Sequence, residues 1–124
     1  MKDRILVVDD EAEIRDMLGQ ALTANGYKVT GVASAAEALA AARGAPPDLI
    51  ISDLQLEDAD GLKMIAELKA LLPDKPVILL TGVLFDTAVV RDVLSSKVAS
   101  YLPKTSSLAK ILETIRQLLE PPAR

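Results

Sequence analysis

The chain has 124 residues, which suits one domain with a single hydrophobic core. It contains no cysteine and no histidine, which excludes disulfides, thiolate metal sites and imidazole catalysis. The formal net charge of −4 argues against a nucleic-acid-binding surface, which needs clustered Lys and Arg, and favours a basic partner over an acidic one.

The two ends of the chain carry no long apolar segment. Only four strongly apolar residues, Ile5 to Val8, precede the first acidic pair, too few for a signal peptide or a membrane span. We therefore expect a cytoplasmic protein with no membrane contact. The prolines at 121 and 122 break a helical pattern, so we expect residues 1–120 to form the domain and 121–124 to be a tail or the start of a linker.

Three continuous apolar runs are typical of strands buried on both faces. They cover residues 5–8, 49–53 and 77–81, and each run ends at or just before a carboxylate or a hydroxyl. Residues 27–32 and 98–102 instead mix apolar with polar or small side chains, as strands with partial exposure do. These two segments are predicted to be edge strands.

Amphipathic patterns between the strands predict five helices. The first begins at Glu11 and ends at Asn25-Gly26, the second begins with a capping box from Ser34 to Glu37, and the fourth begins at Asp86. The second helix carries mostly small side chains, in the alanine-rich stretch Ala38 to Ala42. In the other helices the apolar residues at helical spacing are Ile14, Met17, Leu18, Ala21 and Leu22; Leu62, Ile65, Leu68 and Leu72; Val89, Val90, Val93 and Leu94; and Leu108, Ile111, Leu112, Ile115 and Leu119.

The alternation of strand and helix predicts a fold as well as its elements. It specifies a parallel sheet with helices on both faces. Central apolar strands and mixed edge strands match a doubly wound, flavodoxin-like α/β fold with five strands in the order 2-1-3-4-5. In that order ligands bind beyond the carboxyl ends of strands 1 and 3. Asp9 and Asp10 follow strand 1 and Asp53 ends strand 3, so the three should meet there.

Five polar residues stand at carboxyl ends of predicted strands: Asp9, Asp10, Asp53, Thr81 and Lys104. Taken singly, either of the first two acids would cap a helix, Thr81 would end a strand and Lys104 would be a surface charge. Together they indicate a site, because three close carboxylates repel one another unless a cation lies among them. Oxygen ligands favour Mg²⁺, and the set suits phosphoryl transfer onto a carboxylate, for which we predict Asp53.

The same residues resemble the response-regulator receiver domain of two-component signalling, over residues 4 to about 120. The resemblance is carried by the sequence ILVVDDE at residues 5–11, the Asp53 strand with Asp60-Gly61 downstream, Thr81-Gly82, and Tyr101 three residues before Lys104. It implies that Asp53 is phosphorylated from a sensor histidine kinase or a histidine phosphotransfer protein. An output domain or target protein would then read the surface formed by the fourth predicted helix, the strand over residues 98–102 and the last predicted helix, and a homodimer is a further option.

The resemblance also implies a role for each site residue. Asp10 and Asp53 would bind Mg²⁺ directly, with Asp9 beside the ion or one water away and the backbone carbonyl of Gln55 as a further ligand. Thr81 and Lys104 would contact the phosphoryl group, and Tyr101 would report activation. We expect Gln55 and Val83, near the path of attacking water, to tune hydrolysis.

The chain departs from the usual family pattern at three places. Glu57 replaces a proline four residues after Asp53, and Lys97-Val98 replaces a glycine-alanine pair before strand 5. Lys104-Thr105 replaces a lysine-proline pair, so this peptide is either trans with a rearranged loop or a costly non-proline cis bond. These changes bear on the output surface and the lysine geometry more than on the acidic residues.

Two other functions fit parts of the pattern. A phosphohydrolase working through an aspartyl-phosphate commonly has an acid two residues after its nucleophile, where this chain has Gln55. A pseudo-receiver used only for protein contact would not need the complete acidic set. The expected protein is therefore a signalling module and not an enzyme, apart from its own phosphorylation and slow self-hydrolysis.

Overall fold

Five parallel strands form one sheet in the order β2-β1-β3-β4-β5 in the computed structural model, which describes residues 3–53, 61–81 and 98–119. The strands are β1 (Arg4–Val8), β2 (Lys28–Val32), β3 (Leu49–Ser52), β4 (Val77–Thr81) and β5 (Ser100–Pro103). Residues 5–8 and all of β3 are buried, whereas β2 and β5 are partly exposed. The predicted fold, strand order and central apolar strands are confirmed.

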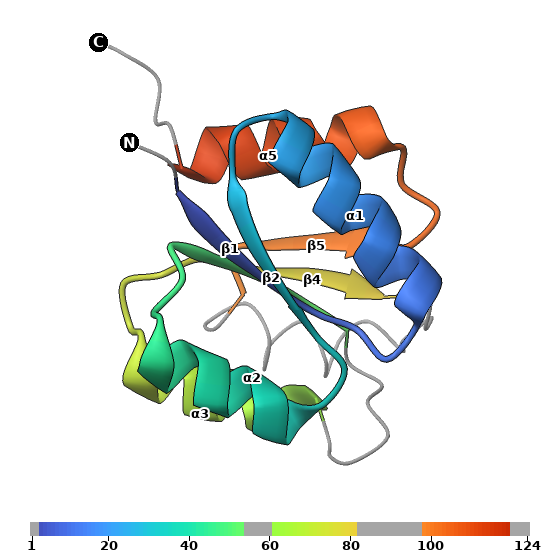
Figure 1. The fold of residues 1–124 in the computed structure, drawn as a ribbon. Coiled ribbons are helices and arrows are strands. Elements are labelled where there is room, and N and C mark those ends of the chain that lie inside the picture. The colour runs from blue at the N-terminus through green and yellow to red at the C-terminus, as the bar shows by residue number, and fades with distance from the viewer. Residues whose placement is uncertain (1–2, 54–60, 82–97, 120–124) are drawn as a thin grey trace, which may run out of the picture.

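Helices cover both faces of the sheet (Figure 1). On one face lie α1 (Ala12–Ala24) and α5 (Leu108–Leu119), and on the other lie α2 (Ala35–Gly44) and α3 (Gly61–Leu71). Because side chains alternate along a strand, each face has its own core. One core joins Leu6, Val8, Ile50 and Leu79 to α2 and α3, and the other joins Ile5, Val7, Ile51 and Ile78 to α1 and α5. The predicted fourth helix lies outside the described residues.

The buried stripe of α1 is narrower than the sequence pattern predicts. Leu18 and Leu22 are fully buried, but Met17, one of the apolar residues at helical spacing, is 42% exposed. The reason is geometric, since Leu18 and Leu22 are one turn apart at the centre of the stripe and Met17 lies about 100° to the side of Leu18. The helix ends as predicted at Asn25, and Gly26 follows with φ of 94°, a left-handed conformation that favours glycine.

Hydrogen bonds define two further element boundaries. The N-cap half of the predicted capping box of α2 is confirmed, because Ser34 Oγ accepts the Glu37 N–H at 3.2 Å. Glu37 Oε2 reaches back one residue further than in the usual box and accepts the Ala33 N–H at 3.1 Å. The last strand, predicted over residues 98–102, starts two residues later and ends one residue later than predicted. It begins at Ser100 and extends to Pro103, because the ladder pairs these residues with Ile78 and Thr81. Proline is tolerated there since β5 is an edge strand.

Among the described residues, the structure holds no helix with the length and apolar character that a membrane crossing requires.

Candidate acidic site at the carboxyl edge of the sheet

The carboxyl ends of β1 and β3 place two aspartates side by side. The register pairs Val8 with Ser52, so the residues that follow each strand leave the sheet at the same level. The Asp53 N–H donates to the Val8 carbonyl at 3.0 Å, which continues the ladder one residue beyond β3. The backbone therefore fixes Asp9 and Asp53 as neighbours although they are far apart in the sequence.

Asp9, Asp10 and Asp53 form one carboxylate cluster. One carboxylate oxygen of each lies within 4.8 Å of the others; Asp9 and Asp53 are buried and Asp10 is half-buried. Burying carboxylates is costly unless they are paired with a cation or well hydrogen-bonded. This donor set of oxygens alone fits a hard divalent ion such as Mg²⁺.

Lys104 supplies the positive charge within this cluster. It directly follows β5, and its Nζ lies 2.8 Å from Asp53 Oδ2, 3.1 Å from Asp9 Oδ2 and 3.4 Å from Glu11 Oε2. The two shorter contacts are to buried aspartates, and the third is to an exposed glutamate. One ammonium thus stands among carboxylates from two different strand ends.

Burial and charge act in opposite directions on the two central groups. Burial raises the pKa of Asp9, and it outweighs the Glu11 N–H and Lys104, which favour the ionised carboxylate. Burial alone would lower the pKa of Lys104, but its hydrogen bonds to Asp53 and Asp9 raise that pKa above the ordinary value. Lys104 therefore stays protonated, whereas desolvation makes the ionised form of Asp9 less favourable than it is in water.

Two residues of the site were not singled out from the sequence. Glu11 is the N-cap of α1; its N–H donates to Asp9 Oδ1 at 2.9 Å, and its carboxylate approaches Lys104. Arg15 Nη1 donates to the backbone carbonyl of Asp9 at 2.6 Å. The sequence spacing was a signal for both residues. Residues 11 and 15 are one helical turn apart immediately after the acidic pair, on a turn that faces the site.

Of the other predicted residues, some lie in the described part of the chain and some do not. Thr81 ends β4 and pairs in register with Pro103, beside Lys104, but its side chain is outside the description. Tyr101 lies on edge strand β5, pairs with Leu79 and is 46% exposed. The Lys104–Thr105 peptide is trans, which decides between the two alternatives. Predictions on Gln55, Val83, Glu57, Asp60, Gly82 and Lys97 fall outside the described residues.

Comparisons with known proteins agree on one family. A family model described as the response regulator receiver domain matches residues 5–116. The response regulator MprA of Mycobacterium sp. (strain KMS) is 34% identical over 126 aligned positions, which cover 96% of this chain and 51% of that protein. The chain thus spans about half the length of the curated relatives it matches.

Solved structures give the same result for the fold. A response regulator receiver domain protein (CheY-like) from Methanospirillum hungatei JF-1 superposes with a TM-score of 0.90 and 30% identity, covering 97% of this chain and 95% of that one. The chemotaxis protein CheY4 of Vibrio cholerae gives a TM-score of 0.87 and 26% identity, over 96% of this chain and 100% of that one. With the family match over most of its length and a carboxylate cluster at the edge of a 2-1-3-4-5 sheet, the chain belongs to the response regulator receiver domain family.

Proposed function

We propose that this receiver domain accepts a phosphoryl group on Asp53 from the phosphohistidine of a sensor histidine kinase or a histidine phosphotransfer protein. The observation that carries the proposal is the position of Asp53, buried beside Asp9 and Asp10 and 2.8 Å from Lys104. A carboxylate is a competent nucleophile for phosphorus when nearby positive charge offsets the charge of the phosphoryl oxygens. Its family membership supports the same chemistry.

The transfer conserves atoms and charge without another reactant. An oxygen of the Asp53 carboxylate forms a bond to phosphorus while the bond between phosphorus and the imidazole nitrogen breaks. The bonding electron pair stays on that nitrogen, the other ring nitrogen of the phosphohistidine keeps its proton so that neutral imidazole leaves, and the product is an aspartyl-phosphate. Asp53 needs no base to activate it, because it attacks as the carboxylate.

The acidic cluster fits the cation that this chemistry requires. Asp9, Asp10, Asp53 and the backbone carbonyl of Gln55 would hold Mg²⁺, which when bound neutralises negative charge on the phosphoryl oxygens. The chain's own part is to orient: β1 and β3 present the carboxylates at one level, and Lys104 from the end of β5 contacts the acceptor. Positioning and electrostatics of this kind provide most of the rate in phosphoryl transfer.

Phosphorylation would then change the partners of Lys104. The phosphoryl group brings about −1.5 to −2 charges and new acceptor oxygens where Lys104 now contacts Asp53 and Asp9. We propose that Lys104 and the Thr81 hydroxyl bond to these oxygens and that the surface of helix 4, β5 and α5, which includes Tyr101, transmits the change to an output domain or target protein. Gln55 and Val83 would set the rate of hydrolysis.

The experiment compares two aspartates at opposite ends of β3. Wild type, Asp53→Asn and Asp48→Asn are incubated with a small acyl phosphate and Mg²⁺, and intact mass is measured. We expect wild type and Asp48→Asn to gain one phosphoryl group, and Asp53→Asn or chelator-treated wild type to gain none. Equal labelling of Asp53→Asn contradicts the assignment, and wild type that neither binds Mg²⁺ nor gains mass indicates a pseudo-receiver. Continuous turnover of a phosphate ester indicates a hydrolase.

A further inference from the structure

Arg15 contacts the acidic site through the main chain of Asp9 and not through a carboxylate. The guanidinium Nη1 donates to the main-chain carbonyl of Asp9 at 2.6 Å, a short charge-assisted hydrogen bond. That carbonyl belongs to the peptide that joins Asp9 to Asp10. Arg15 therefore acts on the orientation of this peptide, and not on a carboxylate directly.

The rest of Asp9 is also held in place. Its N–H donates to the Val32 carbonyl at 3.1 Å, its Oδ1 accepts the Glu11 N–H at 2.9 Å, and its Oδ2 lies 3.1 Å from Lys104 Nζ. The bond from Arg15 fixes the remaining polar group, the carbonyl. Both sides of the Asp9 backbone are thus fixed, one by β2 and the other by α1.

The fixed backbone of Asp9 has its main consequence for Asp10. Within residues 3–53, 61–81 and 98–119, no hydrogen bond or ion pair restrains the Asp10 carboxylate, although it lies within 4.8 Å of those of Asp9 and Asp53. The direction of its side chain then depends on the backbone that leads into it. The preceding peptide is the one that Arg15 holds.

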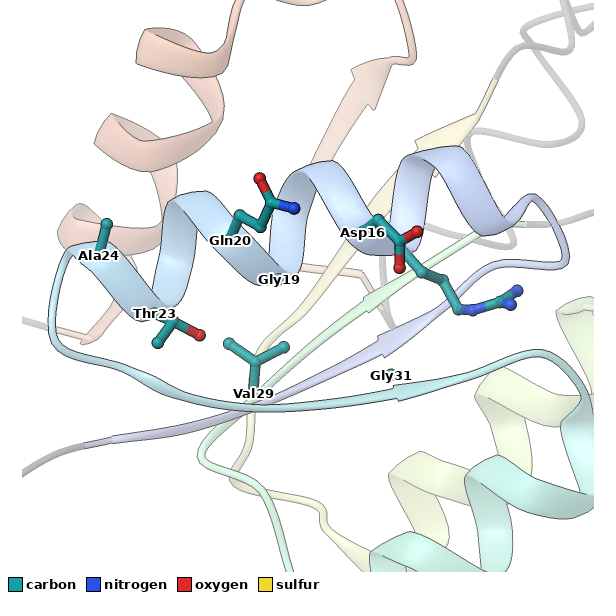
Figure 2. A pocket seen from close by; sticks show the side chains of 8 residues that line it. Asp16, Gly19, Gln20, Thr23, Ala24, Val29 and Gly31 are labelled. Carbon is teal, nitrogen blue, oxygen red and sulfur yellow. The ribbon is translucent and has the colours of Figure 1, made fainter.

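Arg15 is itself guided to this carbonyl by the surface beneath it. Its N–H donates to the Glu11 carbonyl at 3.2 Å, which places it on the first turn of α1. Its stem runs along Gly31 of β2, where a methyl group would stand 3.7 Å from Arg15 Cδ. Figure 2 shows Gly31 on β2 below α1, at the groove that Arg15 also lines. Because Gly31 has no side chain, the Arg15 stem lies close against β2 as it runs back toward Asp9.

We propose that Arg15 is a positioning residue for the cation site, which orients the Asp9–Asp10 peptide so that the Asp10 carboxylate faces Asp53. The proposal rests on the proposed function, since it assumes that these carboxylates hold Mg²⁺. Loss of an outer partner that orients a metal ligand typically weakens metal affinity by about 10- to 100-fold. Arg15 is expected to act in this way on Asp10.

The sign of the effect separates positioning from simple electrostatics. Arg15 is positively charged, so its removal lowers the repulsion felt by an approaching cation and by charge alone would strengthen Mg²⁺ binding. Loss of positioning has the opposite sign. Weaker binding in a variant that lacks the charge is therefore a result that electrostatics alone does not give.

The test measures Mg²⁺ affinity by isothermal titration calorimetry on the unphosphorylated chain. Arg15→Met keeps most of the stem and removes the guanidinium, and it should weaken Mg²⁺ binding by about tenfold. Arg15→Lys keeps the charge and one donor, and its affinity should lie between those of wild type and Arg15→Met. Arg43→Met, on an exposed position in the last turn of α2 on the other face of the sheet, should change affinity by no more than about twofold.

Thermal melting of each variant, without Mg²⁺, accompanies the titration. If Arg15→Met does not fold, Arg15→Lys decides, and an affinity equal to that of wild type overturns the proposal. If Arg15→Met folds and binds Mg²⁺ as tightly as wild type or more tightly, the proposal is also overturned. These results leave the proposed function intact as long as wild type binds Mg²⁺ and gains a phosphoryl group on Asp53. Failure of wild type in both assays is instead a failure of the proposed function.

Discussion

The sheet carries a lysine–aspartate pair at each end of β3, and the two pairs differ in nearly everything but composition. Asp48 directly precedes β3 and lies 3.6 Å from Lys75, with 37% and 39% of their side chains exposed. Asp53 directly follows the strand and lies 2.8 Å from Lys104, with 5% and 14% exposed. Four strand residues separate a surface ion pair from a buried one.

The difference shows what makes a charged pair a candidate site. Asp48 also accepts the Arg4 N–H at 2.8 Å, so at the amino end the carboxylate fastens β1 to the start of β3. At the carboxyl end Asp53 shares its lysine with Asp9, a second buried acid. The charges of the Asp48–Lys75 pair are largely solvated by water. The buried aspartates at the other end concentrate negative charge, which binding of a further cation or addition of a phosphoryl group would change.

Removing Lys104 should give the largest effect on stability. Lys104→Met leaves Asp9 and Asp53 buried without their cation, and breaking a buried pair on one side costs about 3 to 5 kcal/mol. We expect the free energy of unfolding, measured with urea in the absence of Mg²⁺, to fall by about that amount. Because Lys104 occupies the space among the carboxylates, Mg²⁺ should raise the melting temperature of the variant more than that of wild type.

Two outcomes would contradict the prediction for Lys104→Met. A loss below about 1 kcal/mol would mean that the buried pair is worth no more than a surface pair. An equal Mg²⁺-induced rise in wild type and variant would mean that the ammonium and the ion do not compete for the same oxygens.

The second prediction concerns alkaline pH. The pKa of Lys104 is raised in the folded chain above its ordinary value of 10.5. The folded state therefore keeps this proton more strongly than the unfolded state, so the stabilisation from Lys104 is complete below pH 10.5 and is lost as the pH rises from there toward the folded pKa. Unfolding free energies of wild type and Lys104→Met should converge above that pH, by at most about 1.4 kcal/mol per pH unit. A constant difference would show that the ammonium is not the source of the stabilisation.

The sequence was sufficient for most of the fold because its patterns are local consequences of burial. The apolar runs of β1, β3 and β4 were visible because central strands of a parallel sheet are covered on both faces. Boundaries were less accurate where tertiary pairing decides them. The pairing of β4 with β5 places the last strand nearer Pro103 than predicted. The narrow buried stripe of α1 leaves Met17 exposed to solvent.

The acidic cluster could be predicted because topology alone brings the ends of β1 and β3 together. The partners of its members could not, because they depend on how long side chains are directed across the site. The sequence pointed to Lys104 for phosphate but gave no sign that it also bonds Asp9. It gave no sign that Arg15 reaches back over Gly31 to a main-chain carbonyl. Residue types at strand ends predict a site, whereas its charge balance requires coordinates.

The smallest effect is expected at the amino end of the sheet. Lys75→Met removes the exposed partner of Asp48 but leaves the Arg4 N–H in place, so β1 and the start of β3 stay connected through Asp48. Surface ion pairs contribute about 0 to 1 kcal/mol, and salt screens them. We expect the urea unfolding curve of Lys75→Met to move by less than about 1 kcal/mol, with the difference vanishing at about 1 M NaCl. The larger loss in Lys104→Met should persist in the same salt because its partners are buried. A Lys75 effect that is large and insensitive to salt would show that burial is not what separates the two ends of β3.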